Sequence, residues 1–167
     1  RGTTYNSYLI KDEKITLIDT VKHYKFDEMI SRIKEIVDPK KIDYIISNHV
    51  EMDHSGSLPK ISKIAKKAKI ITSTKGEKGL NKHYNDDLKY KVVDSGETLN
   101  IGKRTLHFVH IPMVHWPDSM VTYNPEDKIL FPNDAFGQHI ASSERYDSEI
   151  EWGILKEEAA KYYANIV

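Results

Sequence analysis

Two histidines and two carboxylates lie within six positions of one another, and this cluster is the strongest chemical signal in the sequence. They are His49, Glu51, Asp53 and His54 in the segment SNHVEMDHSG, which follows an apolar stretch, IDYIIS. The carboxyl end of a buried strand is where open α/β sheets bind ligands. Residues 49, 51 and 53 point the same way if the segment is extended, and a bend at Gly56 would bring the second histidine round. Imidazole nitrogens and carboxylate oxygens together predict a site for iron, zinc or manganese.

Two later loops each add one residue of the same kind. His115 lies in IPMVHWPDS, between two predicted strands, and Asp134 lies in FPNDAFG, directly after another. Three strand-end loops that each offer a histidine or an aspartate have the layout of a dinuclear metal site. Trp116 and Phe136 flank these loops, and we expect their rings to wall the pocket and keep it dry.

The elements that must position these loops follow from hydrophobic periodicity. Short apolar or alternating runs predict strands, and apolar residues spaced by three and four predict helices. The order β-β-α-β-α-β-α-β-β-β-β-α predicts a mixed, layered α/β domain rather than a uniform βαβ repeat. The predicted strands are Tyr5–Ile10, Lys14–Asp19, Ile42–Ser47, Lys69–Ser73, Tyr90–Val93, Arg104–Ile111, Met120–Tyr123 and Ile129–Phe131. The predicted helices are Lys25–Val37, Leu58–Ala68, Lys75–Tyr84 and Glu151–Val167.

Composition excludes several classes of protein. Lys and Arg (25) balance Asp and Glu (25), which argues against wholesale electrostatic binding to nucleic acid or anionic lipid. The absence of cysteine excludes disulfides, thiolate zinc sites, cysteine-ligated iron–sulfur centres and a cysteine nucleophile. No apolar run approaches the ~18 residues of a membrane span and no signal peptide opens the chain, so we expect no membrane contact and a cytoplasmic location. Because it starts at Arg1 and stops within a helical pattern, we interpret residues 1–167 as a trimmed or partial domain.

The pattern HxExDH, followed by the histidine of HWPDS and the aspartate of NDAFGQH, resembles the metallo-β-lactamase-type domain of the flavodiiron proteins. These are the oxygen and nitric oxide reductases of anaerobes. The resemblance runs from Gly2 in GTTYN through His139. It implies an αββα sandwich of metallo-β-lactamase type, incomplete here at both ends, that holds a diiron site. It also implies that a flavodoxin-like domain binding FMN belongs to the full-length protein and lies outside this chain.

The resemblance assigns ligands residue by residue. The residues that match the ligands of one iron are His49, Glu51 and His115, those that match the other are Asp53 and His54, and Asp134 matches the bridging carboxylate. His54 has a second interpretation, in which it does not bind the metal but contacts the ligands, and water occupies the coordination position instead. The family's second iron takes one more histidine from a later segment, and no histidine follows His139 in this sequence.

The function implied by the resemblance is reduction of O2 to water, of NO to N2O, or of both, at two iron ions re-reduced by FMN. In the family the flavin comes from the partner subunit of a head-to-tail dimer, some members are tetramers, and a rubredoxin-like protein donates electrons. Hydrolases of the superfamily carry HxHxDH, and Glu51 replaces the second histidine with a hard anionic oxygen that favours iron. The alternatives are a hydrolase with a dinuclear zinc site, or a catalytically incomplete structural fragment. We expect the chain alone to bind one metal or none and to be inactive.

Two further histidines lie close to the motifs in sequence. His139 follows the aspartate loop and is either a proton donor to a reduced oxygen intermediate or a structural residue. His23 follows a predicted strand and either reaches the rim of the site or serves the fold. Structural or surface roles are expected for His83, His107 and His110.

Overall fold

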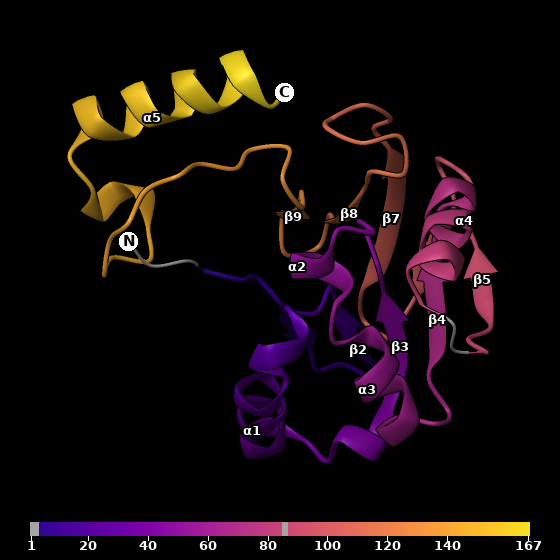
Figure 1. The fold of residues 1–167 in the computed structure, drawn as a ribbon. Helices are drawn as coiled ribbons and strands as arrows, with labels where there is room; N and C mark the ends of the chain where they lie inside the picture. The colour runs from indigo at the N-terminus through magenta and orange to yellow at the C-terminus, as the bar shows by residue number, and fades with distance from the viewer. Residues whose placement is uncertain (1–3, 85–86) are drawn as a thin grey trace.

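Two β-sheets packed against each other form the body of the computed structural model, which describes residues 4–84 and 87–167 (Figure 1). Gly2 and Thr3, where the family resemblance begins, lie outside the described residues. Helices α1, α3 and α4 (Phe26–Ile36, Leu58–Ile64 and Thr74–His83) cover the outer face of the first sheet. This arrangement agrees with the layered, incomplete αββα sandwich expected from the sequence.

The first sheet has five strands in the order β1-β2-β3-β4-β5. Strands β1 and β2 form the predicted antiparallel hairpin, and the later strands are parallel to β2. Each parallel connection passes through a helix, and a common crossover hand, as is usual for parallel strands, accounts for these helices lying on one face. The strands are Tyr8–Ile10, Ile15–Ile18, Ile42–Ile46, Lys69–Thr72 and Tyr90–Val92. Short 3-10 turns precede α1 and β3, at His23–Lys25 and Pro39–Lys41.

The second sheet is a four-stranded antiparallel meander of β6 to β9. Its strands are Thr98–Asn100, Thr105–His110, Met120–Asn124 and Ile129–Phe131. Three of them were predicted. Strand β6 was missed because it has three residues, of which only Leu99 is buried, so it carries almost no periodic signal.

Two apolar clusters correspond to the two interfaces between layers. One lies between the first sheet and its helices, and includes Ile30, Ile45 and Leu58. The other lies between the two sheets, and includes Ile46, Ile71 and Phe108. Neighbouring residues of β3 thus serve opposite faces, and this explains why its sequence is mostly apolar, apart from Asp43, rather than strictly alternating.

The helices differ from the prediction in one boundary and one added element, and agree at the start of the last helix. Helix α3 ends at Ile64, earlier than its apolar spacing suggests, since Ala65 already leaves the helical conformation. Residues expected to continue from β3 as extended chain form a short helix instead, α2 (Met52–Ser55). The last helix, α5 (Trp152–Asn165), begins where predicted, because the Glu151 carboxylate accepts the backbone N–H groups of Gly153 and Ile154.

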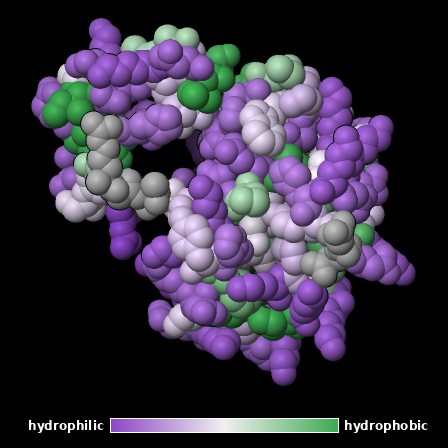
Figure 2. Space-filling view, in the orientation of Figure 1, coloured by the Kyte–Doolittle hydropathy of each residue, from purple (hydrophilic) through white to green (hydrophobic). Residues whose placement is uncertain are grey.

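Helix α5 lies at the end of the molecule opposite α1, reached through a long irregular segment and the turn Asp147–Glu149 (Figure 1). The face of the molecule in Figure 2 is mostly hydrophilic, with small scattered apolar areas. Across residues 4–84 and 87–167, no helix is both long enough and apolar enough to cross a membrane.

The inter-sheet cluster should dominate stability. Replacing the fully buried ring in Phe108→Ala should lower the free energy of unfolding by about 3–5 kcal/mol, because it leaves a cavity between the sheets. Val109→Ala is the matched control, since the next residue on β7 is 42% exposed and should change stability by roughly 0.5 kcal/mol or less. Urea denaturation followed by circular dichroism measures both. Equal effects of the two substitutions would contradict the assignment of this core.

Candidate metal centre

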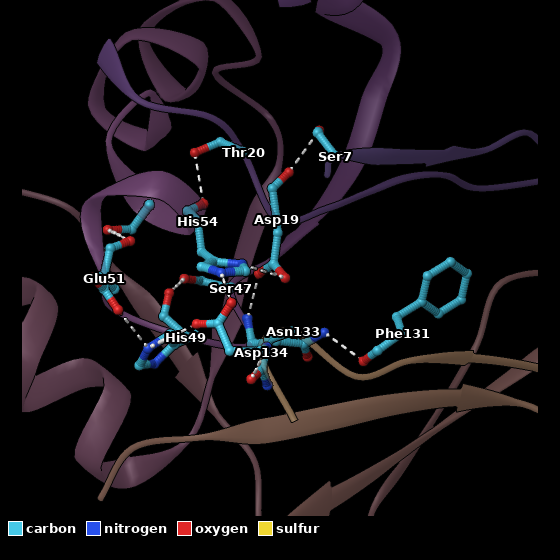
Figure 3. Close-up of polar contacts among 12 residues, drawn as sticks. Ser7, Asp19, Thr20, Ser47, His49, Glu51, His54, Phe131, Asn133 and Asp134 are labelled. Atoms are coloured by element: carbon cyan, nitrogen blue, oxygen red, sulfur yellow. Dashed lines mark hydrogen bonds and ion pairs between the residues drawn. The ribbon is translucent and has the colours of Figure 1, made fainter. Parts of the chain in front are cut away.

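The predicted site residues converge where the two sheets meet at one end. His49 follows β3 of the first sheet, whereas His115 precedes β8 and Asp134 follows β9 of the second. The ring centroid of His49 lies 5.3 Å from that of His115 and 5.4 Å from that of His54. Figure 3 shows His49, His54, Glu51 and Asp134 turned toward a common centre. The three strand-end loops therefore bring their side chains together at one place.

The side chains divide into two groups that could each hold a metal ion. His49, Glu51, His115 and Asp134 offer ligand atoms within 4.8 Å of one another, and Asp53, His54 and Asp134 do the same. Only Asp134 belongs to both groups. These are the divisions and the shared carboxylate that the sequence resemblance implies.

The two oxygens of Asp134 face different groups. Its Oδ2 lies 3.2 Å from Nε2 of His115 and 3.6 Å from Nε2 of His49. Its Oδ1 lies 3.0 Å from Nε2 of His54. A carboxylate oriented in this way can offer one oxygen to each of two cations.

Helix α2 brings Asp53 and His54 to the second group. The extended path considered for residues 49–53 was wrong, because the chain turns into a helix directly after Glu51. The Glu51 carbonyl accepts N–H groups of His54 and Ser55, at 2.9 and 2.8 Å, which closes the turn. The hydroxyl of Ser55 also donates to the Val50 carbonyl at 2.6 Å, so the turn is fixed to the preceding loop.

Asn48 joins the two sheets beside the site. Its side-chain amide donates to the Phe131 carbonyl at 3.2 Å and accepts the Thr122 hydroxyl at 2.7 Å. Its backbone carbonyl accepts the N–H of Met120 at 2.9 Å. The residue is 1% exposed, so these bonds replace water for every polar group involved. This link fixes the first ligand loop relative to strands of the second sheet.

Two buried aspartates support the histidines from behind. Asp118 accepts a hydrogen bond from Nδ1 of His49 at 2.9 Å, and Asp19 lies 3.5 Å from Nδ1 of His54. Sequence reasoning gave neither a role. Asp118 stood inside the quoted motif HWPDS, where its proximity to a ligand was a usable signal. Nothing in the local sequence distinguishes Asp19, whose position depends on the pairing of β2 with β3.

Charge is concentrated in the centre, as the pKa values show. Burial alone would lower the pKa of His54, but its contacts with Asp134 and Asp19 outweigh burial and raise it to about 11. Burial opposes ionisation of Asp134, yet its hydrogen bond with His54 and the charge of that histidine lower the pKa of Asp134 to about 2. Burial, and then the negative charges of the site's three carboxylates, raise the pKa of Tyr162 on α5 to about 12. Excess carboxylate makes the centre favourable for cations.

Orphaned ligand atoms show that metal ions fit this donor set. Nε2 of His49 and Oδ1 of Asp53 are buried and have no hydrogen-bond partner within the described chain. Leaving buried polar atoms unpaired is costly, and a metal ion is a partner suited to both of them. These two atoms are thus available for coordination, whereas Nε2 of His54 and Nε2 of His115 contact the oxygens of Asp134.

The remaining predicted residues have separate positions. Trp116 lies edge-on to His49 with ring centroids 5.2 Å apart, and its side chain is 36% exposed. Phe136 was also expected to wall the pocket, but it is 59% exposed and lies beside Tyr163 of α5. His139 packs against Tyr162, and His23 packs against its neighbour Tyr24. Neither of these histidines belongs to the two ligand groups.

The comparisons with known proteins agree with this geometry. The family described as ODP family beta lactamase matches residues 3–158. A nitric oxide reductase of Moorella thermoacetica is 48% identical over 168 residues, which cover 100% of this chain and 42% of the relative. A rubredoxin-oxygen oxidoreductase of Megalodesulfovibrio gigas is 47% identical over 99% of this chain and 42% of its own length. The chain therefore spans about 42% of the length of these curated relatives.

Solved structures give the same result. The rubredoxin oxygen:oxidoreductase of Desulfovibrio gigas superposes with a TM-score of 0.94 at 47% identity, covering 99% of this chain and 41% of that one. The flavodiiron protein of Giardia intestinalis superposes with a TM-score of 0.91 at 43% identity, covering 97% of this chain and 40% of that one. The resemblance to flavodiiron proteins inferred from the motifs is confirmed.

The link made by Asn48 generates a prediction. Asn48→Ala should lower the free energy of unfolding by about 1–3 kcal/mol for each partner left unsatisfied, because Thr122 and the Phe131 carbonyl stay buried. Asn100→Ala, which removes only hydrogen bonds at the exposed Asn100, should cost roughly 0.5 kcal/mol or less. Chemical denaturation distinguishes them. Indistinguishable midpoints would show that this amide does not hold the sheets together.

Proposed function

Because this chain belongs to the ODP family of beta lactamases, we propose that it is the metal-binding domain of a diiron oxidoreductase. The full-length protein reduces O2 to water, NO to N2O, or both. The observation that carries the proposal is the shared carboxylate: Asp134 faces two separate ligand groups with its two oxygens. Relatives named nitric oxide reductase and rubredoxin-oxygen oxidoreductase support the class of reaction.

The ligands divide between two iron positions. His49, Glu51 and His115 hold the first, Asp53 and His54 hold the second, and Asp134 bridges them. The three carboxylates offset most of the charge of two divalent cations, which makes a partly buried dinuclear site tolerable. Bound iron would supply reversible one-electron chemistry and open positions for a diatomic gas.

The residues of the chain orient the metals and shield them. The loops after β3 and β9 fix ligands from different sheets, so their separation is set by the fold. The indole of Trp116, which is 36% exposed, contacts the ring of His49 edge-on and the ring of His115 at a tilt. No side chain of this site needs to act as nucleophile or general base, because bound iron would supply the electrons and the reduced gas takes up protons rather than losing them.

Glu51 separates this proposal from its closest alternative, a hydrolase with two zinc ions. Its Oε2 lies 3.5 Å from Nε2 of His49 and 3.6 Å from Nε2 of His115, so this carboxylate shares the first ligand group with both histidines. A hard carboxylate oxygen in this place favours iron and stabilises its higher oxidation state. Zinc, which does not change oxidation state, gains nothing from that preference.

The proposal extends to the rest of the protein. We infer that residues 1–167 form one domain and that a flavodoxin-like domain elsewhere in the full-length protein binds FMN. Electrons arrive from a rubredoxin-like donor, consistent with the printed name of one relative. A head-to-tail homodimer, or a tetramer built from it, brings the flavin to the irons, and the protein acts in the cytoplasm.

The bridging role generates a prediction about metal content. Asp134→Ala in the full-length protein should lower iron content from two ions per chain to one or none, because the residue serves both ligand groups. His115→Ala should lose only the ion of the first group. His110→Ala, outside both groups and bonded to the Val93 carbonyl, is the control and should retain full content. Iron is measured by inductively coupled plasma spectrometry after anaerobic purification. Two irons retained in Asp134→Ala would exclude a bridge.

The choice of metal generates a second prediction. Glu51→His should raise zinc occupancy relative to iron and abolish O2 and NO consumption, because the redox-adapted oxygen ligand is gone. Glu35→His, the same change on the exposed face of α1, should leave both measurements unchanged. Gas electrodes and metal analysis on the full-length protein provide the readouts. Full reductase activity in Glu51→His would contradict this role, and zinc-dependent hydrolysis by the unaltered protein would favour the alternative.

A further inference from the structure

We propose that Asp118 and Asp19 are paired positioning residues, one for each metal position. Asp118 orients His49 for the first metal, and Asp19 orients His54 for the second. The inference rests on the proposed metal-binding function, because it concerns which ring nitrogen each histidine presents to a cation. Both carboxylates lie outside the ligand groups themselves.

The Asp118 carboxylate makes its contacts through a single oxygen. Its Oδ2 accepts Nδ1–H of His49 at 2.9 Å and the backbone N–H of Val50 at 2.8 Å. Its side chain is 6% exposed, and its backbone carbonyl accepts the Ser73 hydroxyl at 2.9 Å. A buried carboxylate beside Nδ1 selects the tautomer with the proton on that nitrogen. Nε2 then keeps its lone pair, and Nε2 is the nitrogen that faces Glu51 and Asp134.

Asp19 uses both of its oxygens, one in a hydrogen bond to the backbone and the other in a longer ion-pair contact with His54, whose Nδ1 has no hydrogen-bond partner among the described residues. Its Oδ1 accepts the backbone N–H of Asn48 at 2.7 Å, and its Oδ2 lies 3.5 Å from Nδ1 of His54. The side chain is 4% exposed. Its backbone has a φ of 53°, and the Ser7 hydroxyl donates to its carbonyl at 2.8 Å (Figure 3). Nε2 of His54 is thereby left to face Asp134.

The two aspartates also hold the loop between them. They accept the backbone N–H groups of Asn48 and Val50, on either side of His49. Asp19 follows β2 of the first sheet and Asp118 precedes β8 of the second, so the loop is held from both sheets. Each contact therefore has two effects: it fixes a ring nitrogen, and it fixes the backbone that carries the ring.

Asp118 makes its contacts with one carboxylate oxygen and Asp19 with two, so replacement by asparagine should affect the two positions differently. At position 118, one amide oxygen can still accept both hydrogen bonds, so Asp118→Asn should preserve the orientation of His49. At position 19, an amide that accepts from Asn48 turns its NH2 group toward Nδ1 of His54. That group donates a hydrogen bond, which favours the tautomer with the proton on Nε2 and blocks coordination.

The test is competition for Fe2+ between the full-length protein and a chelator under anaerobic conditions. Asp118→Ala should lower the Fe2+ affinity of the first metal position, the one that His115→Ala removes, by about 10–100-fold. Asp118→Asn should restore most of that affinity. Asp19→Asn should weaken the other ion by a similar factor and leave the first unchanged. Asp43→Asn is the matched control: it removes a partly buried carboxylate that accepts the Ile15 N–H far from the site, and it should change neither affinity.

A second readout does not need metal. Nitrogen-15 chemical shifts of the metal-free protein should show His49 protonated on Nδ1 in the unaltered chain and in Asp118→Asn, and mainly on Nε2 in Asp118→Ala. A purely structural role would change stability without exchanging tautomers. Failure of the unaltered protein to bind Fe2+ would overturn the proposed function. Two tight Fe2+ sites that persist in Asp118→Ala and Asp19→Asn would overturn the pairing alone.

Discussion

The structure depends on satisfying buried backbone groups where the chain leaves β3 between two sheets. The N–H groups of Asn48 and Val50 have no strand partner there, yet both residues are almost inaccessible to water. Asp19 after the first sheet's β2 and Asp118 before the second sheet's β8 accept these hydrogen bonds, and the side chain of Asn48 in turn satisfies the Phe131 carbonyl. Because an unpaired buried N–H is costly, these polar residues are required for the fold before any metal binds. The same bonds determine where His49 points.

The candidate centre follows from that requirement. Groups that satisfy the backbone also hold the imidazoles, so the ligands gain rigidity from bonds that stabilise the protein. The first sheet contributes His49, Glu51, Asp53 and His54, and the second contributes His115 and Asp134. A cation in either group would therefore contact both sheets. Binding energy would add to the docking of one sheet on the other, which couples metal affinity to stability of the inter-sheet core.

Sequence reasoning predicted the parts of this arrangement that depend on local pattern. Strand and helix order came from periodicity, and the ligand residues came from short motifs at strand ends. It failed where position depends on distant pairing. Asp19 lies beside His54 only because β2 runs parallel to β3, and Asn48 bonds Phe131 across 83 residues. The one-turn helix α2 was missed because four residues give no periodic signal, although its turn places Asp53 and His54 in one group.

The two metal positions differ in how much of the fold each requires. The first has its histidines on two sheets, with Asp118 and Trp116 behind His49, so it needs the sheets to be docked. The second takes Asp53 and His54 from a single turn and depends on the second sheet only through Asp134. A loosened inter-sheet contact would therefore separate His49 from His115 but leave Asp53 and His54 together. Asp134 belongs to both positions, so a movement of the loop after β9 would remove a ligand from each of them.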